Sequence, residues 1–382
     1  MSISVIVPIF NAEKFIEETL ISLSKISKEV EEFIFIDDCS NDQSIEILEK
    51  YTNKLDNVKI IKNKINLGVS VSRNIGIKEA VGEWILFCDA DDLIEKSIIV
   101  KYQEVIEKEN IHMIYSNYIQ IDNMGKRISS IMKGQTLTAM DGFCEMVLRN
   151  TIISPSGCLV KKNVLVEIGG FDKTIKVCED VDLWLKILLK KNIIKHCPSV
   201  STFIRRHRSN TTNEIIKANL GEKYILEKYG LDFLEIEFLR RNQSIDKNIL
   251  DYTKILMRFN KFNKALKLIE TINIYESSIL FDEYLFQKAI LNIKVEAFEE
   301  AKEYLNEIIK INRQNGAAIN NLGVLLAKEN KIVEASTLFL KAISIFPNYL
   351  DAAHNLAILN ENQDDYKFTW RELRSELITY IY

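Results

Sequence analysis

The 382-residue sequence contains only 4 prolines and 13 glycines. An all-β protein needs many tight turns, which favour these two residues, so their scarcity argues against such a fold and predicts a high helix content. The six cysteines are scattered, with no C-x-x-C pair and no histidine nearby at metal-ligand spacing. We therefore expect free thiols in a reducing compartment, without a disulfide framework or a zinc site.

The sequence also lacks an excess of positive charge. Lysine and arginine total 50, aspartate and glutamate total 54, and the formal net charge is −4. Proteins that bind the phosphate backbone of a nucleic acid usually have an excess of basic residues, so we expect no nucleic-acid partner. No apolar run approaches the roughly 18 to 20 residues of a membrane span, and residues 1–10 lack the features of a secretory signal. We expect a cytoplasmic protein, with any membrane association peripheral and at the inner face.

Strand and helix signals alternate along the first half of the sequence. Apolar, β-branched runs predict strands at residues 2–9, 32–36, 58–61 and 84–88. Helical patterns lie between these runs, as at residues 69–80. This alternation predicts βαβ units and a mostly parallel sheet that is covered on both faces. Further extended segments are expected near residues 113–121 and 200–204, and a helix follows Glu179.

From about residue 211 the pattern is helical and contains a repeat. The letters NNLG at residues 320–323 recur in outline as HNLA at residues 354–357. This period of about 34 residues, with small residues where two helices would touch, resembles the tetratricopeptide repeat; a generic array of helical hairpins is the alternative. Such arrays usually bind something in a concave groove, so we expect a protein partner or self-association through the repeats.

Acidic and amide residues collect where three of the predicted strands end. They are Asn11 after the first strand, Asp37 and Asp38 after the second, and Asp89, Asp91 and Asp92 after the fourth. Ligands of a doubly wound sheet bind beyond these carboxyl ends. Crowded carboxylates repel one another unless a cation joins them, and Mg²⁺ or Mn²⁺ would also bridge to phosphate oxygens. Each Asp-x-Asp taken alone is equally typical of a helix cap or a solvated loop.

Five separated segments resemble, in order and spacing, the family 2 glycosyltransferases with a GT-A fold. They are SVIVPIFNAEKFIEETLISL, FIFIDDCSNDQS, NLGVSVSRNIGIKEAVGEWILFCDADD, GGFDKTIKVCEDVDLWLK and IRRHRSNTT, which together span residues 4–212. The resemblance implies an α/β GT-A domain at residues 1–212, Rossmann-like and with a mostly parallel sheet. We expect a helical linker at residues 213–250 and an all-α, tetratricopeptide-like domain at residues 251–382.

The resemblance implies donor-binding roles for five residues. Pro8 and Phe10 match positions that border the nucleobase, where Phe10 replaces the more usual tyrosine. Asp38 matches the carboxylate that accepts a hydrogen bond from the uracil ring. Arg73 matches an arginine near the diphosphate, where a planar cation suits oxyanions, although a helix-surface arginine is the alternative. Asp89 matches the first residue of the family's Asp-x-Asp and is expected to contact ribose or a metal-bound water.

The same resemblance implies a divalent metal ion, Mn²⁺ or Mg²⁺. Asp91 is the expected carboxylate ligand, and His207 matches a histidine that completes the metal shell in this family. Imidazole is an acceptable ligand for Mn²⁺, although a lone histidine is often structural. Asp92 either contributes to the site or caps the following helix.

Asp180 matches the family's general base, which removes the proton of the acceptor hydroxyl. Glu179 and Asp180 also suit the N-terminus of a helix on electrostatic grounds, and Asp182 is the alternative base. The resemblance implies a single displacement with inversion at the anomeric carbon. The Gln-x-x-Arg-Trp segment of processive synthases is missing. We therefore expect non-processive hexosyl or N-acetylhexosaminyl transfer from a nucleotide sugar, with UDP-sugars as the expected donors, to a glycan, lipid-linked or protein acceptor.

Two other classes compete with this interpretation. A nucleotidyltransferase usually opens with a glycine-rich phosphate loop that contains arginine and lysine, whereas residues 10–13 read FNAE. A tetratricopeptide-type scaffold with an inactive transferase domain would have no reason to keep the acidic residues, Asp180 and His207 together. The sequence favours an active transferase over both.

Overall fold

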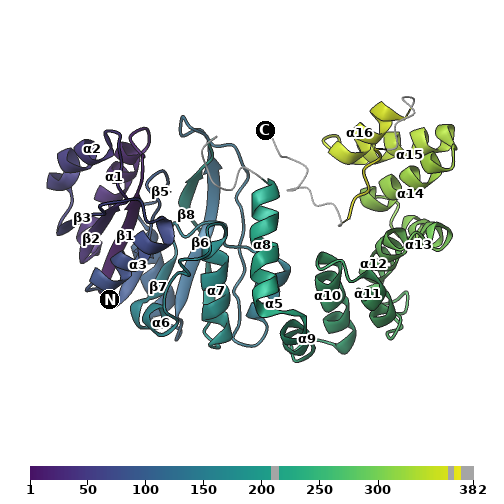
Figure 1. Cartoon of the computed structure of the whole chain (residues 1–382), viewed down its shortest axis with the longest axis horizontal. Coiled ribbons are helices and arrows are strands. Elements are labelled where there is room, and N and C mark those ends of the chain that lie inside the picture. Colours follow the sequence, from purple (N-terminus) through teal and green to yellow (C-terminus); the bar gives the residue numbers. More distant parts are fainter. Residues whose placement is uncertain (208–214, 360–364, 371–382) are drawn as a thin grey trace. The chain divides into compact units, whose positions relative to one another are not determined.

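The computed structural model describes residues 1–207, 215–359 and 365–370 (Figure 1). It divides into two units, Met1–Gly230 and Leu231–Tyr382. The first unit extends beyond the expected domain limit at residue 212 and includes helix α8 (Ile215–Tyr229). The second unit begins with helix α9 (Leu231–Leu239), within the segment that we expected to be a linker.

The described strands of the first unit form one eight-stranded sheet with the order β3-β2-β1-β4-β7-β6-β8-β5. The strands are β1 (Ile3–Ile9), β2 (Glu32–Asp37), β3 (Val58–Lys62), β4 (Trp84–Phe87), β5 (Leu93–Ile94), β6 (Met113–Ile121), β7 (Leu159–Lys161) and β8 (Ile194–Arg205). Strands β1 to β4 are mutually parallel, as are β6 and β8, whereas β7 and β5 pair antiparallel with their neighbours. The predicted mostly parallel sheet is confirmed.

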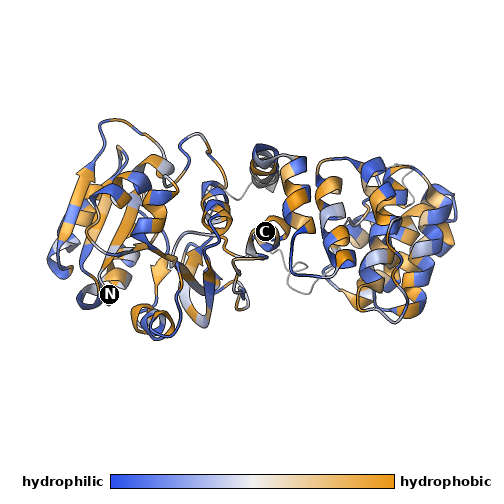
Figure 2. Ribbon diagram, turned by 90° about the horizontal axis from the view of Figure 1, so that it is seen from below, coloured by the Kyte–Doolittle hydropathy of each residue, from blue (hydrophilic) through white to orange (hydrophobic). Residues whose placement is uncertain are grey.

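Helices cover both faces of this sheet. Besides α8 they are α1 (Ile16–Ser24), α2 (Ser44–Tyr51), α3 (Val69–Glu79), α4 (Ile98–Ile106), α5 (Gly142–Leu148), α6 (Lys162–Glu167) and α7 (Glu179–Leu189). On one face, alternate residues of β1 such as Val5 and Val7 share a buried core with Leu20 of α1 and Leu48 of α2. Because both faces are buried, the central strands β1 and β4 are predominantly hydrophobic (Figure 2).

Every described regular element of the second unit is a helix. After α9 come α10 (Ile245–Arg258), α11 (Phe262–Ile269), α12 (Phe281–Lys294), α13 (Phe298–Ile311), α14 (Gly316–Lys328), α15 (Ile332–Ile345) and α16 (Leu350–Ile358). The spacing between the starts of α13 and α15 equals that between the starts of α14 and α16, and it is the spacing of the repeat in the sequence. The all-helical half is confirmed, while the tetratricopeptide assignment stays a prediction. Within the described ranges, we find no helix with both the length and the apolar character needed to span a bilayer.

We predict that Gly76→Ala destabilises the first unit, because α3 lies very close to β1. A Cβ atom at Gly76 would lie 2.6 Å from Cγ2 of Ile6 and 3.1 Å from Cδ1 of Ile36, both of which are buried. Overpacking of this kind costs about 1–3 kcal/mol, and the better helix propensity of alanine offsets roughly 1 kcal/mol of that cost. Urea unfolding should show a net loss, whereas the exposed Lys78→Ala on the same helix should be near neutral. A more stable Gly76→Ala variant would contradict the close packing.

Candidate active site

The candidate site lies at the carboxyl ends of β2, β1 and β4, which are neighbours in the sheet. Pro8 lies in β1 beside Ile36 of β2, and Phe10 follows the strand with 52% of its surface exposed. An aromatic ring left this exposed at the end of a parallel strand is available for stacking. The predicted nucleobase-binding residues are therefore brought together with Asp38, which follows β2.

Asp38 is buried and holds the loop that precedes α3. Its Oδ1 accepts hydrogen bonds from the Asn63 side chain at 2.8 Å and from the Leu67 N–H at 2.9 Å. Its Oδ2 accepts one from the N–H of Gly68 at 2.7 Å. A carboxylate has about four acceptor positions, so these three bonds leave roughly one for the predicted contact with a nucleobase.

Asp91 and His207 lie in direct contact, although 116 positions separate them in the sequence. The His207 Nε2 atom is 2.8 Å from Oδ2 of Asp91. The imidazole ring is stacked on Phe15 of the turn before α1, with the ring centroids 4.5 Å apart. The structure thus brings together the two residues that the sequence predicts as metal ligands.

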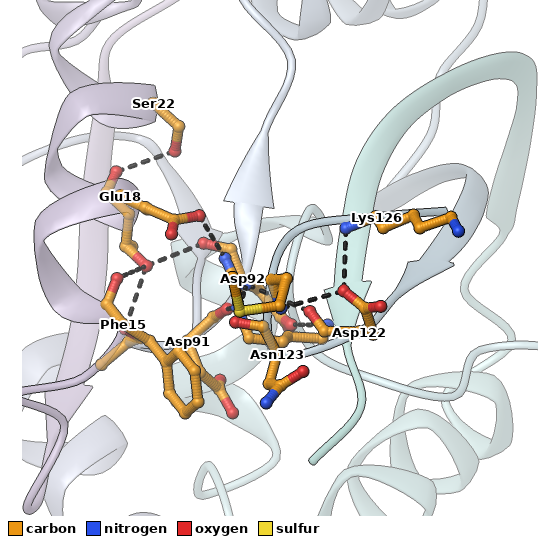
Figure 3. A network of polar contacts seen from close by, with 12 residues as sticks. Phe15, Glu18, Ser22, Asp91, Asp92, Asp122, Asn123 and Lys126 are labelled. Atoms are coloured by element: carbon orange, nitrogen blue, oxygen red, sulfur yellow. Dashed lines mark hydrogen bonds and ion pairs between the residues drawn. The ribbon is translucent and has the colours of Figure 1, made fainter. Parts of the chain in front are cut away.

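A buried arginine, Arg205, contacts the backbone and the aromatic ring that hold this pair. Its Nε donates to the backbone carbonyl of Asp91 at 2.9 Å, and its Nη2 donates to Oε2 of Glu18 at 2.7 Å. Its Nη1 donates to the carbonyl of Asp122 at 3.2 Å, and the guanidinium carbon lies 5.0 Å from the centroid of the Phe15 ring. Figure 3 shows how these partners converge from separate parts of the chain. Arg205 therefore fixes the backbone from which the Asp91 side chain projects.

Asp92 has a structural position instead of either predicted role. Its Oδ1 accepts a hydrogen bond from the N–H of Arg205 at 2.8 Å, which ties β5 to the end of β8. The next element is strand β5, so Asp92 caps no helix. Burial, together with the charges of Asp91 and Asp89, raises the pKa of Asp92 well above its usual range. It is enclosed, and it does not face the Asp91–His207 pair as a third ligand.

Arg73 of α3 connects two carboxylates from distant parts of the chain. Its Nη2 donates to Oδ1 of Asp89 at 2.6 Å, and its Nη1 donates to Oε1 of Glu179 at 2.8 Å. Only 3% of the arginine is exposed. Burial alone would lower the pKa of Arg73, but the charges of Asp89 and Glu179 raise it above its ordinary value. Arg73 therefore positions Asp89 and Glu179 relative to one another, and its predicted contact with a diphosphate stays a prediction.

The residue after Arg73 holds a second loop of the site. The Asn74 side chain donates to the carbonyl of Phe171 at 2.8 Å and accepts from its N–H at 2.9 Å. Gly170 has a φ of +66°, and a Cβ there would lie 2.3 Å from Oδ1 of Asn74, so only glycine fits. The Phe171 ring packs 5.1 Å from the guanidinium carbon of Arg73.

Asp180 lies at the first turn of α7, directly after Glu179, and is half-buried. Burial and the adjacent Glu179 charge raise the pKa of Asp180 to about 7, although the positive charge of Arg73 opposes them. A carboxyl group with this pKa is well suited to general-base chemistry near neutral pH. Asp182, the alternative base, is fully buried and bonded to Lys228 at 2.8 Å, with Lys186 also 2.8 Å away. It is therefore enclosed by lysines and not open to an acceptor.

Several carboxylates of the site lie close enough to affect one another's pKa, but each is bound to a different partner. Asp38 binds N–H groups, Asp89 binds Arg73, and Asp92 binds β8. Among the residues that the structure describes, no group of three or more His, Cys, Asp or Glu side chains could hold a metal ion. The Asp91–His207 pair offers one oxygen and one nitrogen ligand, which fits an ion whose remaining positions are filled by substrate phosphates and water.

Arg205, Glu18 and Phe15 contribute to the site although the sequence predicted no role for them. Arg205 and His207 are two positions apart at the end of a strand, so their side chains are expected on the same face. This spacing was the feature of the sequence that could have placed Arg205 beside the predicted metal ligand. Phe15 looked like an ordinary apolar residue of a helix, and nothing in its neighbourhood indicated a stacked imidazole. Glu18 contacts Arg205 across 187 positions, which no local pattern reveals.

Comparison with known proteins identifies the class of this domain. A sequence model described as glycosyl transferase family 2 matches residues 4–169. This part of the first unit is therefore similar in sequence to glycosyltransferase family 2.

Two relatives have described activities. The chain is 32% identical over 198 residues to the poly(ribitol-phosphate) β-N-acetylglucosaminyltransferase TarS of Staphylococcus aureus, covering 51% of this chain and 34% of TarS. It is 41% identical over 113 residues to a poly(ribitol-phosphate) β-glucosyltransferase of Bacillus spizizenii, covering 29% of this chain and 18% of that protein. The chain thus spans about a third or less of the length of these relatives.

A solved structure shares the fold. The crystal structure of S. aureus TarS 1–349 in complex with UDP-GlcNAc matches with a TM-score of 0.52 and 20% sequence identity. The match covers 94% of this chain and 92% of that one. It confirms the predicted GT-A fold followed by a helical region.

We predict that Arg73→Gln strongly destabilises the first unit, because it leaves Asp89 and Glu179 without their cation. Breaking a buried ion pair by removing one partner costs about 3–5 kcal/mol. Lys59→Gln is the matched control, because Lys59 pairs with Glu79 at the surface and should leave the free energy of unfolding nearly unchanged. Urea denaturation followed by circular dichroism measures both. Equal stability of the two variants would show that the buried group does not hold the site together.

Proposed function

We propose that the chain is an inverting, non-processive glycosyltransferase that moves a sugar from a UDP-sugar to a hydroxyl group of a glycan polymer. The observation that carries this proposal is the Arg73 bridge. It joins Asp89, which follows β4 at the predicted donor site, to Glu179, which precedes the candidate base Asp180. Donor-binding and acceptor-activating groups are thereby fixed relative to one another, as a direct transfer requires.

The relatives support the choice of substrates. TarS is named for transfer of N-acetylglucosamine to poly(ribitol phosphate), and the Bacillus spizizenii protein for transfer of glucose to the same polymer. They share an acceptor and differ in the sugar. We therefore propose a hydroxyl of a polyol-phosphate polymer or a related cell-surface glycan as the acceptor, and UDP-N-acetylglucosamine and UDP-glucose as the donors to test first.

In the proposed mechanism the residues of this chain bind the donor and move one proton. Phe10 stacks on the uracil ring and Asp38 accepts a hydrogen bond from it. The carboxylate of Asp180 takes the proton of the acceptor hydroxyl as its oxygen attacks the anomeric carbon from the side opposite the diphosphate. Asp91 and His207 would hold a Mn²⁺ or Mg²⁺ ion, which when bound stabilises the negative charge of the leaving diphosphate.

We predict that Asp180→Asn lowers the transfer rate by about 10² to 10⁴ and leaves the affinity for UDP nearly unchanged, because the base acts on the acceptor. Initial rates with UDP-N-acetylglucosamine and calorimetry with UDP separate the two effects. Glu167→Gln, an exposed carboxylate of the same unit, is the control. If Asp180→Asn keeps more than about a tenth of the activity, another group is the base.

The raised pKa of Asp180 also predicts a pH dependence. The base works only as the carboxylate, so kcat/KM should be close to its maximum above about pH 8 and fall about tenfold per pH unit well below about pH 7. An ordinary aspartate would hold its activity down to about pH 4 to 5. A profile that stays flat to pH 5, in buffers where the enzyme remains folded, would rule out Asp180 as the titrating group.

We predict that UDP binding depends on a divalent ion held by Asp91 and His207. Calorimetric titration with UDP should show about tenfold or greater loss of affinity in excess chelator, because the diphosphate then loses its cation. Asp91→Asn should remove the response to Mn²⁺, whereas the exposed Asp56→Asn should keep it. Equal UDP affinity of the wild-type protein with Mn²⁺ and with chelator would contradict the metal role.

A further inference from the structure

In the second unit, an extended segment at residues 365–370 is bound through its main chain by asparagine side chains. The Asn321 side chain of α14 donates to the carbonyl of Thr369 at 2.8 Å. In return, the N–H of Thr369 donates to Oδ1 of Asn321 at 2.7 Å. One amide side chain thus satisfies both backbone groups of one residue.

The same arrangement recurs one helix pair later. The Asn355 side chain of α16 donates to the carbonyl of Lys367 at 2.9 Å and accepts from its N–H at 2.6 Å. Asn321 and Asn355 occupy equivalent positions of the repeat, because each lies at the same distance from the start of its own helix. The residues that they bind are two apart, which is the repeat of an extended chain. One step along the helical repeat, from Asn321 to Asn355, therefore corresponds to two residues of the extended segment.

A third buried asparagine completes the contact. Asn320 accepts a hydrogen bond at Oδ1 from the Asn355 side chain at 2.9 Å and donates to the carbonyl of Lys367 at 3.0 Å. All three asparagines are fully buried, and buried amides cost free energy unless they are hydrogen-bonded. With the segment in place, the three amides are thus both buried and hydrogen-bonded.

The preceding helix pair offers an equivalent position. Gln287 of α12 lies one repeat before Asn321 and is also buried. Its Oε1 has no hydrogen-bond partner within the described part of the chain. An acceptor in this position suits the N–H of a bound segment longer than residues 365–370.

Side-chain contacts define which peptide fits. The Thr369 hydroxyl donates to Oδ2 of Asp351 at 2.7 Å and also contacts the hydroxyl of Tyr349. Tyr366 and Phe368 pack on an apolar cluster that includes Phe339 of α15. The Trp370 ring lies under the Lys294 ammonium group, 3.4 Å from the centroid. The site thus selects aromatic residues at alternate positions, with a serine or threonine between the last two.

We propose that Gln287, Asn320, Asn321 and Asn355 form a binding site for an extended polypeptide, and that residues 365–370 are its intramolecular ligand. A peptide of the same pattern binds by displacing this segment. The main chain of the peptide provides the hydrogen bonds and its aromatic side chains provide the selectivity, so proteins with alternating aromatic residues are the partners that fit. This site is independent of the transferase activity proposed for the first unit.

The test uses the full chain and a fluorescent peptide of residues 365–370. Thr369→Pro in the protein removes the N–H that Asn321 binds, which frees the site for a peptide added in trans. Because the resident segment reduces the competent fraction, the wild-type protein should bind the peptide about tenfold or more weakly than the Thr369→Pro protein. Adding Asn321→Ala to Thr369→Pro should abolish binding.

Two methylated peptides provide matched controls. A peptide N-methylated at Thr369 loses the bond to Asn321 and should not bind the Thr369→Pro protein. One N-methylated at Phe368 should bind, because that N–H makes no hydrogen bond in the described part of the chain. If the Thr369→Pro protein melts as the wild type does and yet binds neither the unmodified nor the Phe368-methylated peptide, the proposal is wrong.

Hydrogen exchange on the wild-type protein tests the proposal even if Thr369→Pro fails to fold. The amides of Lys367 and Thr369 should exchange at least about tenfold more slowly than that of Phe368, because only the first two are bonded to buried asparagines. Similar, fast exchange at all three positions would show that the segment is not held in this site and would overturn the proposal.

Discussion

The arrangement of the first unit depends on one buried guanidinium and the two carboxylates that pair with it. Arg73 comes from α3, Asp89 from the end of β4 and Glu179 from the start of α7, and hydrogen bonds of 2.6 Å and 2.8 Å join them. A charge buried to this degree is tolerated only when it is paired and hydrogen-bonded. The three elements must therefore meet in this one arrangement, and Asp180, next to Glu179, is positioned as a consequence.

A second arginine positions the Asp91–His207 pair, as Arg73 positions Glu179. Arg205 ends β8, and its guanidinium bonds to the backbone of residue 91 and to Glu18 of α1. Its stacking partner, Phe15, also stacks on His207. The two candidate ligands are thus oriented by groups that need not touch a substrate. This division explains why several carboxylates at one edge of the sheet can have different roles.

The sequence predicted elements with strong periodicity and missed those that depend on pairing across the sheet. Strand β1 and helix α3 follow from their hydrophobic patterns, whereas β5 and β7 are only two and three residues long and exist because β8 and β4 pair with them. Similarly, the resemblance located Arg73, Asp91 and His207, but it could not show that Arg73 pairs with two carboxylates. That outcome depends on where α7 packs, which no local pattern contains.

The candidate site of the first unit consists mainly of ionisable side chains, whereas that of the second unit consists of neutral amide side chains. The proposed transferase site needs groups that hold charged phosphates and move a proton, and ionisable groups such as Asp180, whose pKa is raised by burial, suit this task. The second unit binds a neutral main chain, for which an asparagine amide supplies one donor and one acceptor in matched geometry. These main-chain bonds do not depend on the side chains of the bound segment. The helical repeat places successive amides opposite every second residue of the extended segment. Selectivity then comes from the contacts that the aromatic side chains between and beside these residues make with the helices.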